Sequence, residues 1–203
     1  MFLTNLKKVL FSKAFSDMSI AKKAAFAGVF VALMTVANSF LSIDISPSVK
    51  ISFNYFLSFF CGVIFGPVIG FAICFLGDLL AFLMPVFGGG VYWLPTGICS
   101  GLLAFIPGLV FGIIDFDFRG GVFAKTAISV VCTYLFITCG LGALSNYYYV
   151  KFVINGGEYS KAFFVYLGGK ILVSSIVSAI NYALIFITIP IFNSISAIGF
   201  KIE

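Results

Sequence analysis

Two charged residues, Asp78 and Lys170, lie inside long apolar stretches of this sequence, in "FLGDLL" and "YLGGKIL". Ionisable side chains are costly inside a membrane, so such residues are functional candidates by default. We expect both to lie at a similar depth. Two interpretations are open: the charges neutralise one another across a helix contact, or both line an outward-facing cavity that binds a polar ligand.

Other hydrogen-bonding side chains fall in the same outer half of the predicted helices. Taken singly, Ser, Thr and Asn residues are more typical of contacts between membrane helices. Their shared depth nevertheless indicates a polar site. The additional candidates are Asn54, Thr96, Ser100, Asn146, Asn181 and the tyrosines Tyr147–Tyr149.

The apolar pattern is interrupted by "FLMPVFGGGVYWLPTG", residues 82–97. Glycine tolerates backbone conformations and close approaches that other residues resist, so we expect a loop here that hinges over a binding pocket. Aromatic residues at a membrane surface also serve as interfacial anchors, which is the alternative interpretation. The predicted hinge is Gly88, Gly89 and Gly90, and the covering aromatic residues are Phe87, Tyr92 and Trp93.

Several kinds of chemistry are excluded by residues that the sequence lacks. It contains no histidine, so neither a Ser-His-Asp triad nor a Cys/His zinc site can form. The five cysteines fall within predicted spans and form no Cys-x-x-Cys pair, which favours a structural role. No phosphate-binding GxxxxGK[ST] loop is present. We therefore expect no enzyme, no metal, no resident cofactor and no ATP hydrolysis by this chain.

The composition predicts an all-α membrane protein. Of 203 residues, 62% are hydrophobic and 9% charged, too few charges for a water-facing surface. A bilayer crossing takes about 20 apolar helical residues. We expect a single domain, 1–203, with six spans and a hairpin at Gly66-Pro67; reading 51–77 as one tilted helix would give five. The predicted spans are 24–43, 51–65, 67–84, 91–114, 126–150 and 162–200.

Basic residues predict the orientation of these spans. With six crossings, the lysines before the first span, Arg119, Lys125 and Lys201 share one side, which predicts cytoplasmic termini. Residues 1–20 form either an amphipathic surface helix or a flexible segment. The basic residues form no patch or stripe, so nucleic-acid binding is not expected. We expect a multi-pass protein of a prokaryotic plasma membrane.

Small residues recur every four positions in the first span, at Ala24, Gly28 and Ala32. Such a stripe lets another helix approach closely. It serves either packing within the chain or docking of a partner subunit.

Residues 48–113 resemble the substrate-binding S components of energy-coupling factor (ECF) transporters, and most of all the folate group. The matching pieces are "KISF", "FGP" at the hairpin, "GDLL", the glycine-aromatic-proline loop and "GLVFG". Lys170 stands where the folate group usually has Arg. The resemblance implies a protein that captures a vitamin outside the cell. It then docks on a transmembrane coupling subunit driven by two cytoplasmic ATPases.

The resemblance also implies roles for the candidate residues. Asp78 would accept hydrogen bonds from a pterin ring, and the three loop aromatics would stack on its faces. Lys170, Lys50 or Lys161 would meet the glutamate carboxylates of folate. Three alternatives stay open: another vitamin such as pantothenate or a pyrimidine precursor, a small autonomous secondary transporter, or a membrane scaffold without ligand.

Overall fold

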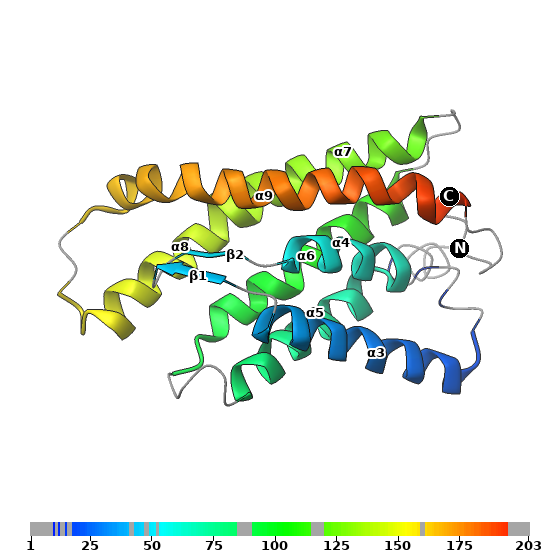
Figure 1. Ribbon diagram of the computed structural model, residues 1–203, viewed down its shortest axis with the longest axis horizontal. Coiled ribbons are helices and arrows are strands. Elements are labelled where there is room, and N and C mark those ends of the chain that lie inside the picture. The colour runs from blue at the N-terminus through cyan, green and yellow to red at the C-terminus, as the bar shows by residue number, and fades with distance from the viewer. Residues whose placement is uncertain are drawn as a thin grey trace.

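A computed structural model describes residues 10, 12, 15, 18–40, 43–46, 49–51, 53–84, 91–114, 120–158 and 161–194. Helices running roughly along one direction make up most of it (Figure 1). Span five, Gly121–Ile154, contains two π-helical segments and is kinked at Gly140, whose backbone is not helical. In chain order the elements are α3 Ile20–Ser39, β1 Ile43–Ser46, β2 Val49–Ile51, α4 Asn54–Phe65, α5 Pro67–Leu83, α6 Leu94–Ile113, α7 Gly121–Thr133, η2 Tyr134–Leu141, α8 Gly142–Tyr149, η3 Val150–Ile154 and α9 Phe163–Ser194.

These helices confirm the prediction of a six-span all-α membrane protein. Four of them are long and apolar enough to cross a membrane, and α4 and α5 are shorter apolar helices within the described part of the chain. The start of α3 and the end of α9 lie at the same end of the molecule, as six crossings require (Figure 1). Most span limits are within a few residues of those predicted, but α3 begins at Ile20 rather than residue 24.

The turn between α4 and α5 depends on one glycine. Gly66 has φ +85°, a conformation that residues with a Cβ rarely adopt. Pro67 then begins α5, where its fixed φ suits the first helical turn and its missing N–H is not needed. Residues 51–77 therefore do not form one tilted helix, and the five-span alternative is wrong.

A short β-hairpin occupies the segment between the predicted spans 24–43 and 51–65. Ile43 pairs with Ile51 and Asp44 with Lys50, in antiparallel register. Residue 51 thus ends a strand instead of beginning a helix, and α4 starts three residues later. The hairpin lies beyond the N-terminus of α4, and β2 contacts α9 (Figure 1).

Helix α4 by itself is shorter than the hydrocarbon layer that its span crosses. Its 12 residues extend about 18 Å, against about 30 Å of hydrocarbon. Backbone that is not helical is tolerated at membrane depth only where protein covers it or where it lines an aqueous cavity. The N-terminus of α4 must therefore be covered by protein or border an aqueous cavity.

Glycines bring the backbones of α4, α5 and α6 into direct contact. A Cβ at Gly62 would overlap the carbonyl oxygen of Ala104, and one at Gly108 would lie 2.6 Å from Pro67 N. A Cβ at Gly70 would lie 3.0 Å from the Cα atom of Gly62. Small residues permit such close approach between membrane helices, and packing is then the main source of association.

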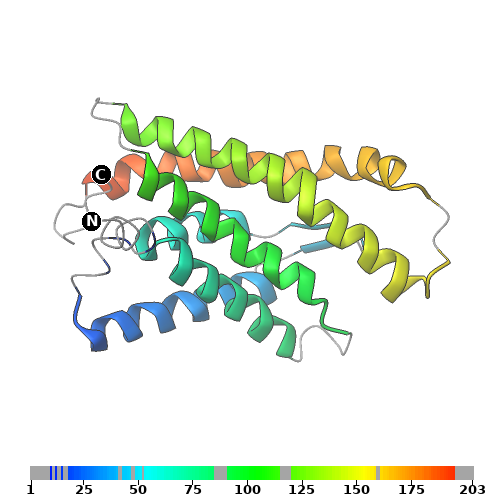
Figure 2. The same cartoon turned by 180° about the vertical axis from the view of Figure 1, so that it is seen from behind.

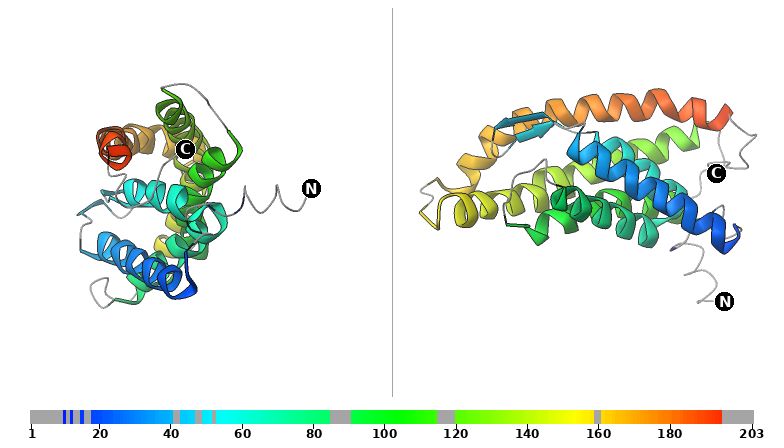
Figure 3. Two further views of the ribbon diagram at one scale, coloured as in Figure 1. Left: turned by 90° about the vertical axis from the view of Figure 1, so that its right-hand side faces the viewer. Right: turned by 60° about the horizontal axis from the view of Figure 1, so that its bottom comes forward.

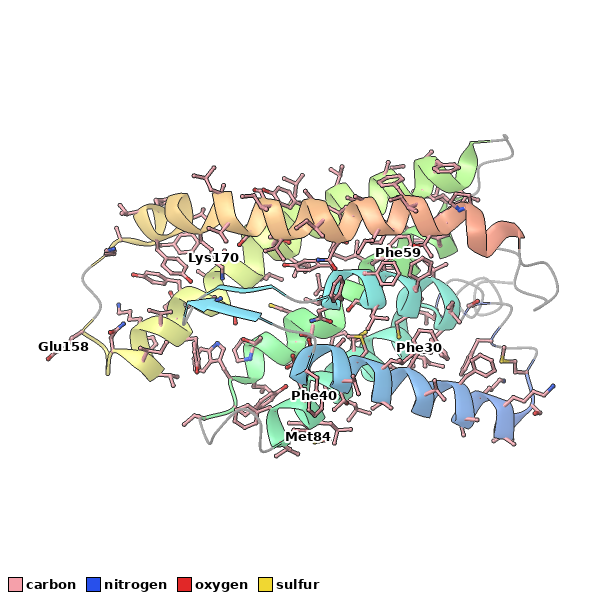
Figure 4. All side chains as sticks on the ribbon, in the orientation of Figure 1. Phe30, Phe40, Phe59, Met84, Glu158 and Lys170 are labelled. Carbon is pink, nitrogen blue, oxygen red and sulfur yellow. The ribbon has the colours of Figure 1, made fainter. Side chains whose placement is uncertain are left out.

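Two apolar clusters surround this contact. In the first, Phe65 and Cys74 pack with Met34 of α3. In the second, Phe59 of α4 packs with Ile185 and Ile189 of α9. Figure 4 shows Phe59 between α4 and α9 and Phe30 where α3 approaches α4. Together the clusters fix α4 between the first and last spans.

The small-residue stripe of α3 does not serve packing within the described chain. Ala24, Gly28 and Ala32 are all exposed, and a Cβ at Gly28 would meet nothing within 4 Å. Helix α3 lies at the periphery of the bundle, away from α7 and α9 (Figure 3). Among the described residues, no other helix packs against this stripe.

Gly62→Ala should destabilise the protein, because the new methyl group must push α6 away from α4. Overpacking of this kind costs roughly 1–3 kcal/mol, more than the gain in helix propensity. Thermal unfolding in detergent, followed by circular dichroism, measures the effect. Gly28→Ala is the matched control, since its methyl group meets open space. Equal unfolding temperatures for the two variants would contradict the proposed contact.

Candidate binding site

Asp78 receives hydrogen bonds from two different segments. The Tyr92 hydroxyl donates to Oδ2 at 3.2 Å, and the buried Ser100 hydroxyl of α6 donates to Oδ1 at 3.1 Å. Asp78 itself lies on α5 and is half-buried. Hydroxyl donors stabilise a carboxylate within an apolar surrounding. The structure thus brings together three of the predicted site residues.

Tyr92 reaches Asp78 only because residue 97 is a glycine. A Cβ at Gly97 would overlap the Tyr92 hydroxyl, and the Tyr92 ring also lies 5.2 Å from that of Phe82. Burial raises the pKa of the Tyr92 phenol, and the Asp78 carboxylate raises it further. Both effects favour the neutral phenol, so Tyr92 remains a hydrogen-bond donor to Asp78 throughout the physiological pH range.

Trp93 contacts α8, whereas the neighbouring Tyr92 contacts α5. Its indole Nε1 donates to both the carbonyl oxygen and the hydroxyl oxygen of Ser145, each at 3.1 Å. Its ring centre lies 6.1 Å from that of Tyr149. Residues 91–93, which we name the aromatic strap, therefore connect α5 through Tyr92 with α8 through Trp93. Span five runs alongside α6, as Figure 2 shows from behind.

Lys170 lies across the site from Asp78 and has different contacts. Its ammonium is 5.8 Å from the centre of the Tyr166 ring, and its side chain is half-buried. Figure 4 shows it on the side of α9 that faces α8 and the hairpin. Cys99 of α6 lies near enough to both Asp78 and Lys170 to interact with the charge of each.

Two other predicted site residues contact neighbouring helices, and a third bonds within its own helix. The side-chain oxygen of Asn181 accepts the backbone N–H of Phe56 at 3.2 Å, which caps the first turn of α4 from α9. Thr96 of α6 lies 3.4 Å from the Ser145 hydroxyl of α8, a contact typical of polar residues between membrane helices. Asn54 accepts a hydrogen bond from Ser58, one turn later in α4.

A group of hydroxyls that the sequence analysis did not single out lies next to the α4 N-terminus. Tyr55 comes from α4, Thr138 from η2, and Ser178 and Tyr182 from α9; we name them the hydroxyl cluster. Thr138 donates to the Tyr55 hydroxyl at 3.3 Å, and the rings of Tyr55 and Tyr182 lie 6.1 Å apart. A sequence signal existed: the dipeptide Asn-Tyr occurs at 54–55, 146–147 and 181–182.

The remaining candidates divide between described and undescribed residues. Phe87, the glycines Gly88, Gly89 and Gly90, and the side chain of Lys50 lie outside the described residues. Tyr147 is buried and donates to the backbone carbonyl of Lys161 at 3.0 Å. Its ring packs against Tyr166, the neighbour of Lys170, so this tyrosine supports the site from outside.

An apolar pocket of about 390 Å³ lies behind Trp93, between α6 and span five. Its size falls within the range of small-molecule pockets. Its lining offers few polar groups, so it suits apolar or flat parts of a molecule and not charged ones. The lining includes Trp93, Cys99, Leu102, Leu141, Leu144 and Tyr148.

The cysteines occupy the positions expected of structural residues. Cys61 and Cys74 are buried in the α4–α5 hairpin, and the other three are half-buried. No group of three or more potential metal ligands occurs among the described residues.

The chain is similar to a protein family, to a relative in sequence and to a solved structure. Residues 18–190 match the family of the ECF-type riboflavin transporter, S component. A UPF0397 protein of Onion yellows phytoplasma (strain OY-M) is 33% identical over 107 residues, 53% of this chain and 55% of that protein. The chain thus matches about half the length of this relative. The crystal structure of FolT bound with folic acid is similar in fold, with a TM-score of 0.60, 18% identity and coverage of 81% of this chain and 90% of FolT.

Gly97→Ala should loosen the aromatic strap, because a methyl group there displaces the Tyr92 hydroxyl from Asp78. Trp93 is the only tryptophan, so its fluorescence reports on this strap. We expect a red-shifted emission and stronger acrylamide quenching in the variant. Gly168→Ala, where a Cβ would meet nothing within 4 Å, is the matched control. Wild-type emission and quenching in Gly97→Ala would show that the contact does not position the strap.

Proposed function

Because the chain belongs to the family of ECF-type riboflavin transporter S components, and is thus an integral membrane protein with a transport role, we propose that it captures a folate-type vitamin for an ATP-driven importer. The observation that carries the proposal is the Asp78 carboxylate, held at the end of α5 by Tyr92 and Ser100. The ligand would enter from the outer side, between the aromatic strap, α6 and α9. Both termini would face the cytoplasm.

The carboxylate favours a pterin over a flavin ring. A pterin presents an amino group beside a ring N–H, two donors that match the two oxygens of Asp78. The corresponding edge of a flavin has one N–H between two carbonyl groups, whose lone pairs would face the carboxylate. The family description names riboflavin, and the FolT structure was solved with folic acid. We propose folate and not riboflavin because the Asp78 carboxylate can accept both donors of a pterin.

The other charges and aromatic rings would complete the site. Lys170 and the exposed Lys161 are cations on the outer half of α9 and in the loop before it, suited to the glutamate carboxylates of folate. Tyr92 and Trp93 would cover the bound ring, each already fixed to a different helix. Because the strap is held at both sides, ligand entry would require at least one of these hydrogen bonds to open.

The partner surface would be the exposed stripe of α3. Ala24, Gly28 and Ala32 leave a groove on the lipid-facing side into which a helix of the transmembrane coupling subunit could pack. Two cytoplasmic ATPases would drive that subunit, since the chain has no nucleotide-binding loop of its own.

Asp78→Asn should weaken folic acid binding about tenfold or more, because the amide loses the charge and one of the two acceptors. Isothermal titration of the purified protein with folic acid and with riboflavin measures this. Glu158→Gln, which removes a carboxylate from the loop between span five and α9, is the matched control (Figure 4). Unchanged folic acid affinity in Asp78→Asn would refute the pterin contact. Mass spectrometry of the purified protein would identify any other vitamin bound.

Gly28→Leu should abolish uptake but not binding. The larger side chain fills the groove of α3, which lies away from the ligand site. The measurement is uptake of radiolabelled folic acid by cells that contain the coupling subunit and ATPases, alongside titration of the purified variant. Val29→Leu on the same helix is the control. If Gly28→Leu supports normal uptake, α3 is not the docking surface; uptake by proteoliposomes of this chain alone would favour an autonomous transporter.

A further inference from the structure

We propose that the apolar pocket between α6 and span five is a lipid site, which holds one acyl chain of an anionic phospholipid and places the phosphate of that lipid at Lys151. The pocket is the one that lies behind Trp93. The proposal goes beyond the capture of a vitamin, because it gives the outer end of the molecule a second ligand of a different chemical class.

The pocket opens away from α9 and from the proposed vitamin site. On span five its lining residues Leu141, Leu144 and Tyr148 recur three and four positions apart, so they share one side of the helix. Val150, on the other side, belongs to a buried cluster with Tyr166 of α9. Leu141 and Leu144 are 51% and 39% exposed. Apolar side chains on the outer face of a membrane span contact lipid tails, which are as apolar as leucine.

Large side chains shape the pocket for a lipid chain and not for a protein helix. The rings of Tyr148 and Phe152 are stacked, with their centres 5.8 Å and their planes 7° apart, and they form one wall. Ile98 and Leu102 of α6 form the facing wall. A helix is about 10–12 Å wide and approaches closely only over small residues. An acyl chain is thinner and needs only apolar contacts, which both walls offer.

A cation stands at the outer rim of the pocket. The Lys151 ammonium lies 5.5 Å from the centre of the ring of Phe152, a lining residue. Lys151 falls in the last turn of span five. That span has 34 residues, about 51 Å at 1.5 Å per residue, so its ends reach beyond a hydrocarbon layer of about 30 Å. An ammonium at the level of the headgroups attracts an anionic phosphate, while the acyl chain below it fills the pocket.

Trp93 separates the pocket from the vitamin site. It lines the pocket, and its indole Nε1 donates to the carbonyl and hydroxyl oxygens of Ser145. A chain in the pocket would therefore cover the lipid side of the indole and restrict the movement of the aromatic strap.

Quenching of Trp93 fluorescence by brominated lipids tests the proposal, because Trp93 is the only tryptophan and bromine quenches an indole at close contact. The protein is reconstituted in phosphatidylcholine bilayers that contain an increasing fraction of phosphatidylglycerol with brominated acyl chains. We expect quenching that saturates at a low fraction. Brominated phosphatidylglycerol should bind about fivefold more tightly than brominated phosphatidylcholine, as for one lysine beside an anionic headgroup.

Two pairs of variants separate the headgroup from the chain. Lys151→Gln should remove the preference for phosphatidylglycerol, whereas Lys22→Gln, at an exposed lysine near the opposite end of the bundle, should keep it (Figure 1). Leu144→Phe should reduce quenching by either lipid, because the ring occupies part of the pocket. Leu135→Phe is the matched control on the same span, since Leu135 is 56% exposed but does not line the pocket.

The comparison of the two lipids on the wild-type protein needs no variant and can overturn the proposal by itself. Quenching that rises in proportion to the brominated fraction, with no preference between the headgroups, would show ordinary boundary lipid. Equal quenching in Leu144→Phe and Leu135→Phe would place the chain elsewhere. Relief of the quenching by folic acid, together with weaker folic acid binding in Leu144→Phe, would assign the pocket to the vitamin. If the protein binds no vitamin, the proposed function fails while the lipid measurements still decide this inference.

Discussion

The close backbone contact of α4, α5 and α6 determines where every part of the site can lie. Lipid offers no hydrophobic driving force between helices, so contact area and fit must hold them together. Gly62, Gly70 and Gly108 provide that fit by leaving out the side chain where backbones meet. The contact sets the height of α5 against α6, which brings Asp78 level with Ser100. It also sets the level at which α4 ends.

That level matters because α4, with 12 residues, extends over only part of the length of the bundle. The side chain of Asn181, 125 residues after Phe56, caps the first turn of α4. The first and last thirds of the chain are therefore joined at this point. The hairpin passes over the open end of α4 and contacts α9 through β2. The proposed site would therefore be bounded by the N-terminus of α4, by the hairpin and the aromatic strap, and at the sides by α6, span five and α9.

Hydropathy predicted the spans, and the Gly66-Pro67 turn predicted the α4–α5 hairpin, because both depend on local chemistry. The strands of 43–51 were missed, since segments of four and three residues carry little periodic signal. The partner of Trp93 could not be predicted, because Ser145 is one of many small polar residues in span five. Asp78 and Lys170 were recognisable as rare charges. The hydroxyl cluster was not predicted, because it forms only where particular faces of three helices pack together.

The length of α9 has a consequence for the surroundings of the site. Its 32 residues extend about 48 Å, while the hydrocarbon layer is about 30 Å thick. Tilts of membrane helices rarely exceed about 40°, which is too little to absorb the difference. Part of α9 must therefore stand in the headgroup layer and beyond it. Lys170, seven residues from Phe163, would lie near that layer, where anionic phospholipid headgroups and salt become competitors for the same ammonium.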